Sequence, residues 1–99
     1  MILEAFSQYL KQQDETISAD ILLSKWLREK LKHSPQDNIQ NIIHAEIEFS
    51  ADENGNLIFK GKSKSGKILL DALYNFAQSY EQQKFGRWVH KLRASDFPS

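Results

Sequence analysis

The sequence contains no cysteine among its 99 residues. Disulfide bonds and metal sites built on thiolates are therefore excluded. Small extracellular domains usually need disulfides to support a small core, so the absence of cysteine favours a reducing compartment, and we expect a cytoplasmic protein. The first residues agree with this expectation, because they lack the basic start of a secretory signal and carry an acid at Glu4.

Long apolar runs are also absent. No wholly aliphatic run exceeds three residues; one of them is Ile68-Leu69-Leu70, which Asp71 ends. A membrane-spanning helix needs about 20 apolar residues, so the sequence predicts no membrane crossing. Leu, Ile, Val and Phe nevertheless make up 27 of the 99 residues, enough for one hydrophobic core, and we expect a single domain over residues 1–99.

The formal net charge is zero, but the charges are unevenly distributed along the chain. Residues 1–59 carry 5 Lys or Arg against 10 Asp or Glu, whereas residues 60–99 carry 8 against 3. Such an asymmetry provides a basic surface for an acidic partner, or it lets two parts of one domain attract each other. The sequence leaves both interpretations open.

Three segments have apolar residues at helical spacing. Residues 2–12 form the first, and the second follows Ser18, a typical N-cap, with Asp20 in its first turn. The third is long and spans about residues 66–93, with Gly86 as a place where it could kink or break. A further short helix is indicated by Ser34 as N-cap and Pro35 at the first helical position.

A period of two replaces the helical period near Ile43, which predicts a β-hairpin over about residues 43–62. The turn is expected at Glu53-Asn54-Gly55, because a three-residue hairpin loop favours Gly at its third, left-handed position. This turn sets a register that pairs Phe49 with Phe59, Glu48 with Lys60, and Glu46 with Lys62. The sequence therefore predicts an α+β fold with N-terminal helices, one antiparallel β-hairpin (about 43–62) and a long C-terminal helical segment (about 66–93).

Gly61 and Gly66-Lys67 have the G-x-x-x-x-G-K spacing of a phosphate-binding loop. The resemblance is partial, because Ile68 replaces the hydroxyl residue that holds Mg²⁺ and the preceding strand belongs to a hairpin rather than to a parallel unit. We do not expect nucleotide hydrolysis. The surrounding lysines could still hold an anion near a helix N-terminus, or the segment could be a solvated loop.

No residue pattern predicts catalysis or a bound cofactor. A cysteine nucleophile and a Gly-x-Ser-x-Gly elbow are both missing, so we expect a protein that is not an enzyme. His44, Glu46 and Glu48 would project from one face of the predicted strand, where they could in principle bind a metal ion. Pairing of the two glutamates with lysines explains them without a metal, so none is expected.

Two classes of function remain. The first is a small protein-binding module of the immunity, inhibitor or adaptor type, of bacterial or phage origin. It would contact another protein through the acidic hairpin tip of Asp52 and Glu53, or through a basic surface of Lys62, Lys64, Lys67, Arg87 and Lys91. The alternative is a nucleic-acid-binding protein, winged-helix-like in its element order. Its basic set comprises Lys60, Lys62, Lys64, Lys67, Arg87, Lys91 and Arg93.

Charge weakens the winged-helix interpretation, because the hairpin tip is acidic and the short helix that starts at Pro35 has no Lys or Arg. Self-association through Trp88 and Leu92 is a third possibility. Both a monomer and a homodimer therefore stay open at this point.

Overall fold

The computed structural model describes residues 2–85 and contains four helices and one hairpin. In chain order the elements are α1 (Ile2–Lys11), α2 (Ala19–Lys32), α3 (Asn38–Glu46), β1 (Ile47–Ala51), β2 (Leu57–Gly61) and α4 (Lys64–Phe85). This order confirms the α+β fold and the long C-terminal helix. The predicted continuation of that helix through Gly86 to residue 93 lies outside the described residues.

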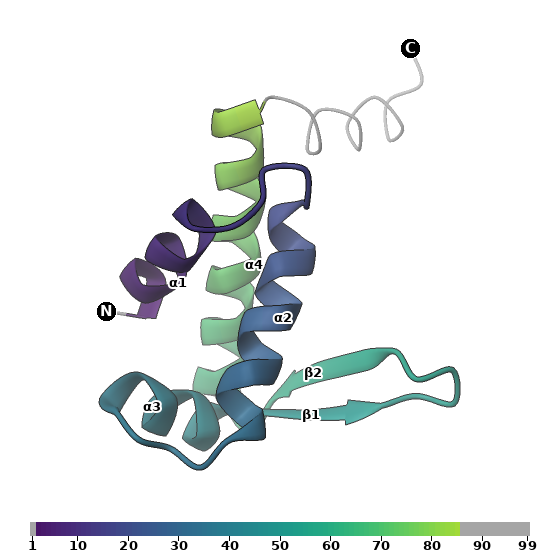
Figure 1. Ribbon diagram of the computed structural model, residues 1–99. Coiled ribbons are helices and arrows are strands. Elements are labelled where there is room, and N and C mark those ends of the chain that lie inside the picture. Colours follow the sequence, from purple (N-terminus) through teal and green to yellow (C-terminus); the bar gives the residue numbers. More distant parts are fainter. Residues whose placement is uncertain (1, 86–99) are drawn as a thin grey trace.

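Helices α2 and α4 run antiparallel along each other and form the centre of the molecule (Figure 1). Their facing sides bury Leu23 and Leu27 of α2 and Leu73 and Ala77 of α4, each with an exposed fraction of 0%. These positions follow the helical spacing of apolar residues in each segment, so the apolar stripes of the two helices face each other.

The first helix closes one side of this pair through an aromatic cluster. The ring of Phe6 lies 5.2 Å from that of Trp26 in α2 and 6.0 Å from that of Phe76 in α4, measured between centroids. One buried ring therefore connects three helices, and such pairs add about 0.5–1.5 kcal/mol beyond the burial of their surface. None of the described helices is long and apolar enough to cross a bilayer.

Helix α3 begins three residues later than predicted, at Asn38 rather than at Pro35. Asp37 is the N-cap, and its carboxylate accepts a hydrogen bond from the backbone N–H of Gln40 at 2.8 Å. The side-chain oxygen of Gln40 in turn accepts one from the backbone N–H of Gln36 at 3.1 Å. This reciprocal pair satisfies two donors at the helix start, which Ser34 would not do.

The first strand begins at Ile47, four residues after the predicted change of period. Ile43 and Ile47 are both fully buried, and their spacing of four fits a helix as well as a strand. Ala45 would lie beside them on a strand but is exposed, as a helix requires. His44 and Glu46 therefore belong to α3, and the three groups considered for a metal ion do not share a strand face.

The hairpin has the predicted register and turn. Phe49 pairs with Phe59 and Glu48 with Lys60, and Asp52 and Asn56 close the loop with a backbone hydrogen bond of 2.9 Å. Gly55 has a φ of +82°, the left-handed conformation expected at the third loop position. The ladder continues one step toward the helices, because the N–H of Lys62 donates to the carbonyl of Glu46 at 2.7 Å.

The two glycines of the phosphate-loop spacing have a packing role. A Cβ atom at Gly66 would overlap the carbonyl oxygen of Glu46, and one at Gly61 would overlap the backbone N of Lys67. The end of α3, the end of β2 and the first turn of α4 thus meet backbone to backbone. Only glycine permits this approach.

This contact predicts whether Gly66→Ala raises or lowers the free energy of unfolding. Gly66→Ala in an exposed helix would increase the free energy of unfolding by about 1 kcal/mol through helix propensity. Here we expect it to decrease by about 2 kcal/mol, because the new methyl group meets a backbone oxygen that cannot move independently. Urea denaturation measures the change, with the exposed neighbour Ser65→Ala as control. A stability equal to or above that of the wild type would contradict the close approach.

Candidate functional site

The hairpin extends away from the helices (Figure 1), and its contacts with the core include the buried Ile47 and the partly buried Phe59. Cross-strand pairing places five apolar residues on one side, which we call the apolar hairpin face: Ile47, Phe49, Ala51, Leu57 and Phe59. Ile47 is fully buried at the root, but Phe49 is 39% exposed and Ala51 is exposed. The face therefore continues beyond the part that the helices cover.

Phe49 is the aromatic residue of the uncovered part of this face, and it lies beside Phe59, which is partly buried against the core. The rings of Phe49 and Phe59 lie 6.1 Å apart and are inclined by 30°. Cross-strand aromatic pairs of this kind stabilise a hairpin by about 0.2–1 kcal/mol, so they hold each other in place. Phe59 thus anchors the ring of Phe49, which is the one of the two that is exposed to solvent.

The opposite face of the hairpin is polar apart from Ile58, which is 37% exposed. It carries a hollow of about 190 Å³ that is lined by Glu48, Phe49, Ser50, Ile58 and Lys60. Apolar side chains thus reach solvent on both sides of a two-stranded element. A binding partner could therefore contact the hairpin from both sides.

The two acids at the tip have different environments. The carboxylate of Asp52 accepts hydrogen bonds from the backbone N–H groups of Asn54 (2.8 Å) and Asn56 (2.9 Å), and from the side-chain amide of Asn56 (3.3 Å). These bonds, the backbone bond from Asn56 first, lower the pKa of Asp52. Asp52 therefore holds the turn, whereas Glu53 is exposed and makes no hydrogen bond within the described residues.

The predicted basic set is divided by the structure. Lys60, Lys64 and Lys67 are exposed around the root of the hairpin and the first turn of α4, whereas the Nζ of Lys62 donates to the carbonyl of His44 at 2.7 Å. Arg87, Lys91 and Arg93 lie outside the described residues. Trp88 and Leu92, proposed for self-association, lie outside them as well.

The segment with the phosphate-loop spacing does not form an extended loop. Helix α4 already begins at Lys64, so Gly66 and Lys67 are helical and only two residues connect β2 to α4. The Ser63 hydroxyl accepts a hydrogen bond from the N–H of Gly66 at 3.4 Å, and the Ser63 carbonyl accepts one from that of Lys67. These donors serve the helix start, so the resemblance to a nucleotide-binding loop does not extend to its backbone.

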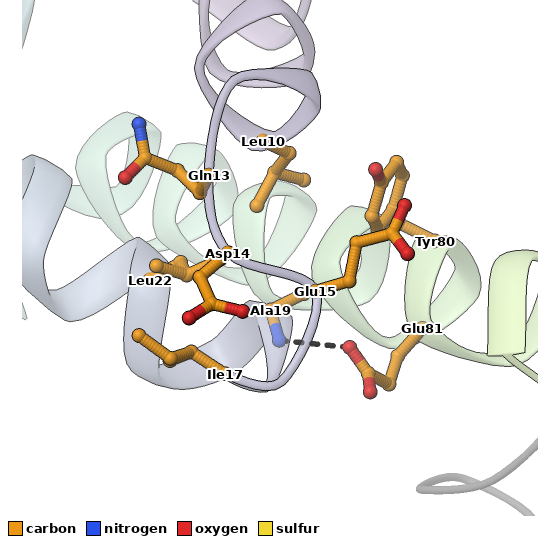
Figure 2. Close-up of a pocket in the computed structure, with 9 residues that line it drawn as sticks. All are labelled: Leu10, Gln13, Asp14, Glu15, Ile17, Ala19, Leu22, Tyr80 and Glu81. Carbon is orange, nitrogen blue, oxygen red and sulfur yellow. Dashed lines mark hydrogen bonds between the residues drawn. The ribbon is translucent and has the colours of Figure 1, made fainter.

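Two polar contacts that sequence reasoning missed hold the ends of α2. At its start, the backbone N–H of Ala19 donates to the buried carboxylate of Glu81 at 2.9 Å, as Figure 2 shows. The adjoining cavity measures only about 10 Å³, the space of one water molecule, so it is not a ligand site. At its end, His44 Nε2 lies 2.9 Å from the carbonyl of Lys30 and 2.8 Å from that of His33, which makes it the donor to both.

Comparison of the chain with models of protein families, with curated proteins and with solved structures found no match. Within residues 2–85, no group of three His, Asp or Glu side chains is placed to hold a metal ion. The site is therefore described by its own geometry, an aromatic, two-sided hairpin with an acidic tip.

The contact of Glu81 predicts an unusual helix cap. Ser18 occupies the N-cap position of α2 but makes no capping hydrogen bond with its side chain, because its hydroxyl donates to Asp20 at 2.7 Å. We expect Ser18→Ala to cost less than about 0.5 kcal/mol, whereas Glu81→Ala costs about 2 kcal/mol by leaving a buried donor unsatisfied. Urea denaturation of both variants tests this. A larger loss for Ser18→Ala would assign the cap to the serine instead.

The environment of Asp52 predicts a pH dependence of the turn. Because the folded pKa is lowered, the ionised carboxylate stabilises the turn above the ordinary value of about 4, and this contribution is lost as the pH falls through the lowered pKa. The NMR signals of Gly55 and Asn56 should therefore change with a midpoint below that value. Asp52→Asn should abolish the transition, and Glu53→Gln should preserve it. A midpoint at the ordinary value would show that the turn bonds are not formed.

Proposed function

We propose that the protein is a small non-catalytic protein-binding module that inserts its hairpin into an apolar groove of another protein. One observation carries this proposal, the exposure of Phe49 on one face of the hairpin and of Ile58 on the other, beyond the part that the helices cover. Aromatic side chains that enter a desolvated pocket dominate the free energy of many protein interfaces. The absence of cysteine supports a cytoplasmic setting for this role.

The way in which this hairpin is stabilised supports its insertion into a partner. Two strands without a covered face are at best marginally stable in water. This hairpin is fixed at its root, and its aromatic pair preorganises the remainder. Because a preorganised segment loses little conformational entropy on binding, more of the contact energy remains for affinity.

The charges around the tip indicate what the partner should carry. Glu53 is exposed at the end of the hairpin, and the carboxylate of Asp52 lies beside it. We therefore infer a partner whose apolar groove is bordered by Lys or Arg. Such complementary charges increase the association rate and fix the orientation of the complex more than they add affinity.

A photo-crosslinking amino acid at position 49 tests the proposal in the native host. Position 68 is the matched control, because Ile68 is 61% exposed but belongs to α4 rather than to the hairpin. We expect one discrete adduct with a different protein from position 49 and none from position 68. An adduct with a second copy of the chain, or equal labelling from both positions, would contradict the proposal.

The purified partner then provides the quantitative measurement. We expect calorimetry to give a 1:1 complex that Phe49→Ser weakens at least about 30-fold, equivalent to roughly 2 kcal/mol, as for an interface hot spot. Ile68→Ser should leave the affinity unchanged. Glu53→Lys should slow association with little effect on the free energy of unfolding, since Glu53 makes no contact that holds the turn.

The nucleic-acid alternative stays a prediction. Within the described residues, the basic surface for this alternative consists of Lys60, Lys64 and Lys67, because the Nζ of Lys62 is bonded to α3. The exposed residues of α3 are Asn38, Asn41, Ile42 and Ala45, which include no cation. Phosphate contacts from this helix are therefore lacking, which favours the protein-binding proposal.

A further inference from the structure

A second hollow lies on the surface of α1 and α2, on elements that the hairpin proposal does not use. It has a volume of about 350 Å³ and is lined by Tyr9, Lys25, Arg28, Glu29 and Lys32. This volume lies within the range of small-molecule sites. Three of the five lining residues are cations, although residues 1–59 as a whole are acidic.

The cations are arranged with like charges next to each other. Lys25, Arg28 and Lys32 follow a spacing of three and four along α2, so they share one side of the helix and span about 10 Å. Like charges at this spacing destabilise a helix by a few tenths of a kcal/mol. None of the three forms an ion pair within the described residues.

The acids of this half of the chain are largely engaged elsewhere. Asp37 caps α3, Asp52 holds the hairpin turn, and Asp14 accepts hydrogen bonds from Thr16. Glu29 is the one acid in the lining, and its carboxylate lies 3.8 Å from His33. The three cations are thus left available for a ligand.

Tyr9 adds a neutral donor to this arrangement. Burial raises its pKa, and the nearby carboxylate of Glu29 raises it further. The phenol therefore keeps its proton at neutral pH and can donate a hydrogen bond. Its ring is half-buried against the core, 6.4 Å from that of Trp26, so the hydroxyl is held by packing.

We propose that this hollow is a binding site for a ligand that carries at least two phosphate charges. Arg28 provides a planar pair of donors that fits phosphate oxygens, while Lys25 and Lys32 place single charges on either side of it. A ligand with a single carboxylate would neutralise only one of these three positive charges, whereas two phosphate groups match them better. The phosphates could belong to a small nucleotide-like ligand or to a nucleic-acid backbone, which share this chemistry.

The test is an NMR titration of the full chain with inorganic pyrophosphate. We expect saturable shifts at Tyr9 and over residues 25–32. The triple variant Lys25→Gln, Arg28→Gln, Lys32→Gln should weaken binding at least about tenfold, because three charge-assisted contacts are lost. Arg28→Gln alone should give a smaller loss, and its exposed position protects the fold.

A matched control tests whether the loss of binding reflects the site or only the change in net charge. The triple variant Lys60→Gln, Lys64→Gln, Lys67→Gln loses the same charge from exposed residues around the hairpin root, and it should retain the affinity for pyrophosphate. Equal losses in both variants, or shifts without saturation, would overturn the proposal. The hairpin proposal is unaffected by either result, because no hairpin residue lines the hollow.

A second titration, with a ten-nucleotide thymidine strand, identifies the source of the phosphate. Binding much tighter than that of pyrophosphate, lost with Lys25, Arg28 and Lys32, supports the site with a nucleic-acid backbone as its ligand. Its affinity should then fall with salt with a logarithmic slope of about −2, as three phosphate contacts to a single strand predict. Binding no tighter than that of pyrophosphate supports the site with a small phosphate ligand.

Discussion

The contact between Gly66 and the carbonyl of Glu46 determines where the hairpin leaves the body of the protein. No side chain separates the first turn of α4 from the junction of α3 and β1 at this point. Lys62 reinforces the same junction twice, through its N–H to Glu46 and through its Nζ to His44, both at 2.7 Å. The hairpin direction is therefore set by backbone contacts at its root, and its outer half needs no cover from the helices.

Helix α2 provides the common support for the two proposed surfaces, and its ends depend on side chains from distant parts of the chain. Glu81, 62 residues away in sequence, accepts the hydrogen bond from its first residue, and His44 binds its last carbonyls. A helix terminus leaves several backbone groups without partners, so such contacts are required where an end is buried. They also couple α2 to α3 and α4, between which the hairpin root lies.

Local rules were sufficient to predict the hairpin register but not the start of its first strand. The turn at Glu53-Asn54-Gly55 and the pairing of Phe49 with Phe59 depend on steric preferences and alternation that neighbouring residues carry. The start of β1 is not determined by such local preferences, because the spacing of Ile43 and Ile47 suits a helix and a strand equally. The choice is made by packing, which buries both residues while Ala45 faces solvent.

The site residues were predictable to a lesser degree. An acid in the apolar stripe of a helix is a signal, and Glu81 continues the stripe of Leu73 and Ala77, so its burial could have been inferred. Its partner at Ala19 could not, since that contact exists only in the fold. The cations of α2 were missed for a different reason, because counting charge over residues 1–59 averaged a local basic surface into an acidic half.

The two proposed surfaces should respond in opposite ways to ionic strength. Burial of the apolar hairpin face removes hydrocarbon from water, a contribution that salts weaken little and that excluded salts strengthen. Attraction in the hollow of α1 and α2 arises among exposed cations, which salt screens over about 8 Å at physiological strength. Ionic strength therefore distinguishes the two proposals physically. A protein complex that persists at high salt would fit the hairpin proposal, because the charged surfaces contribute least under that condition.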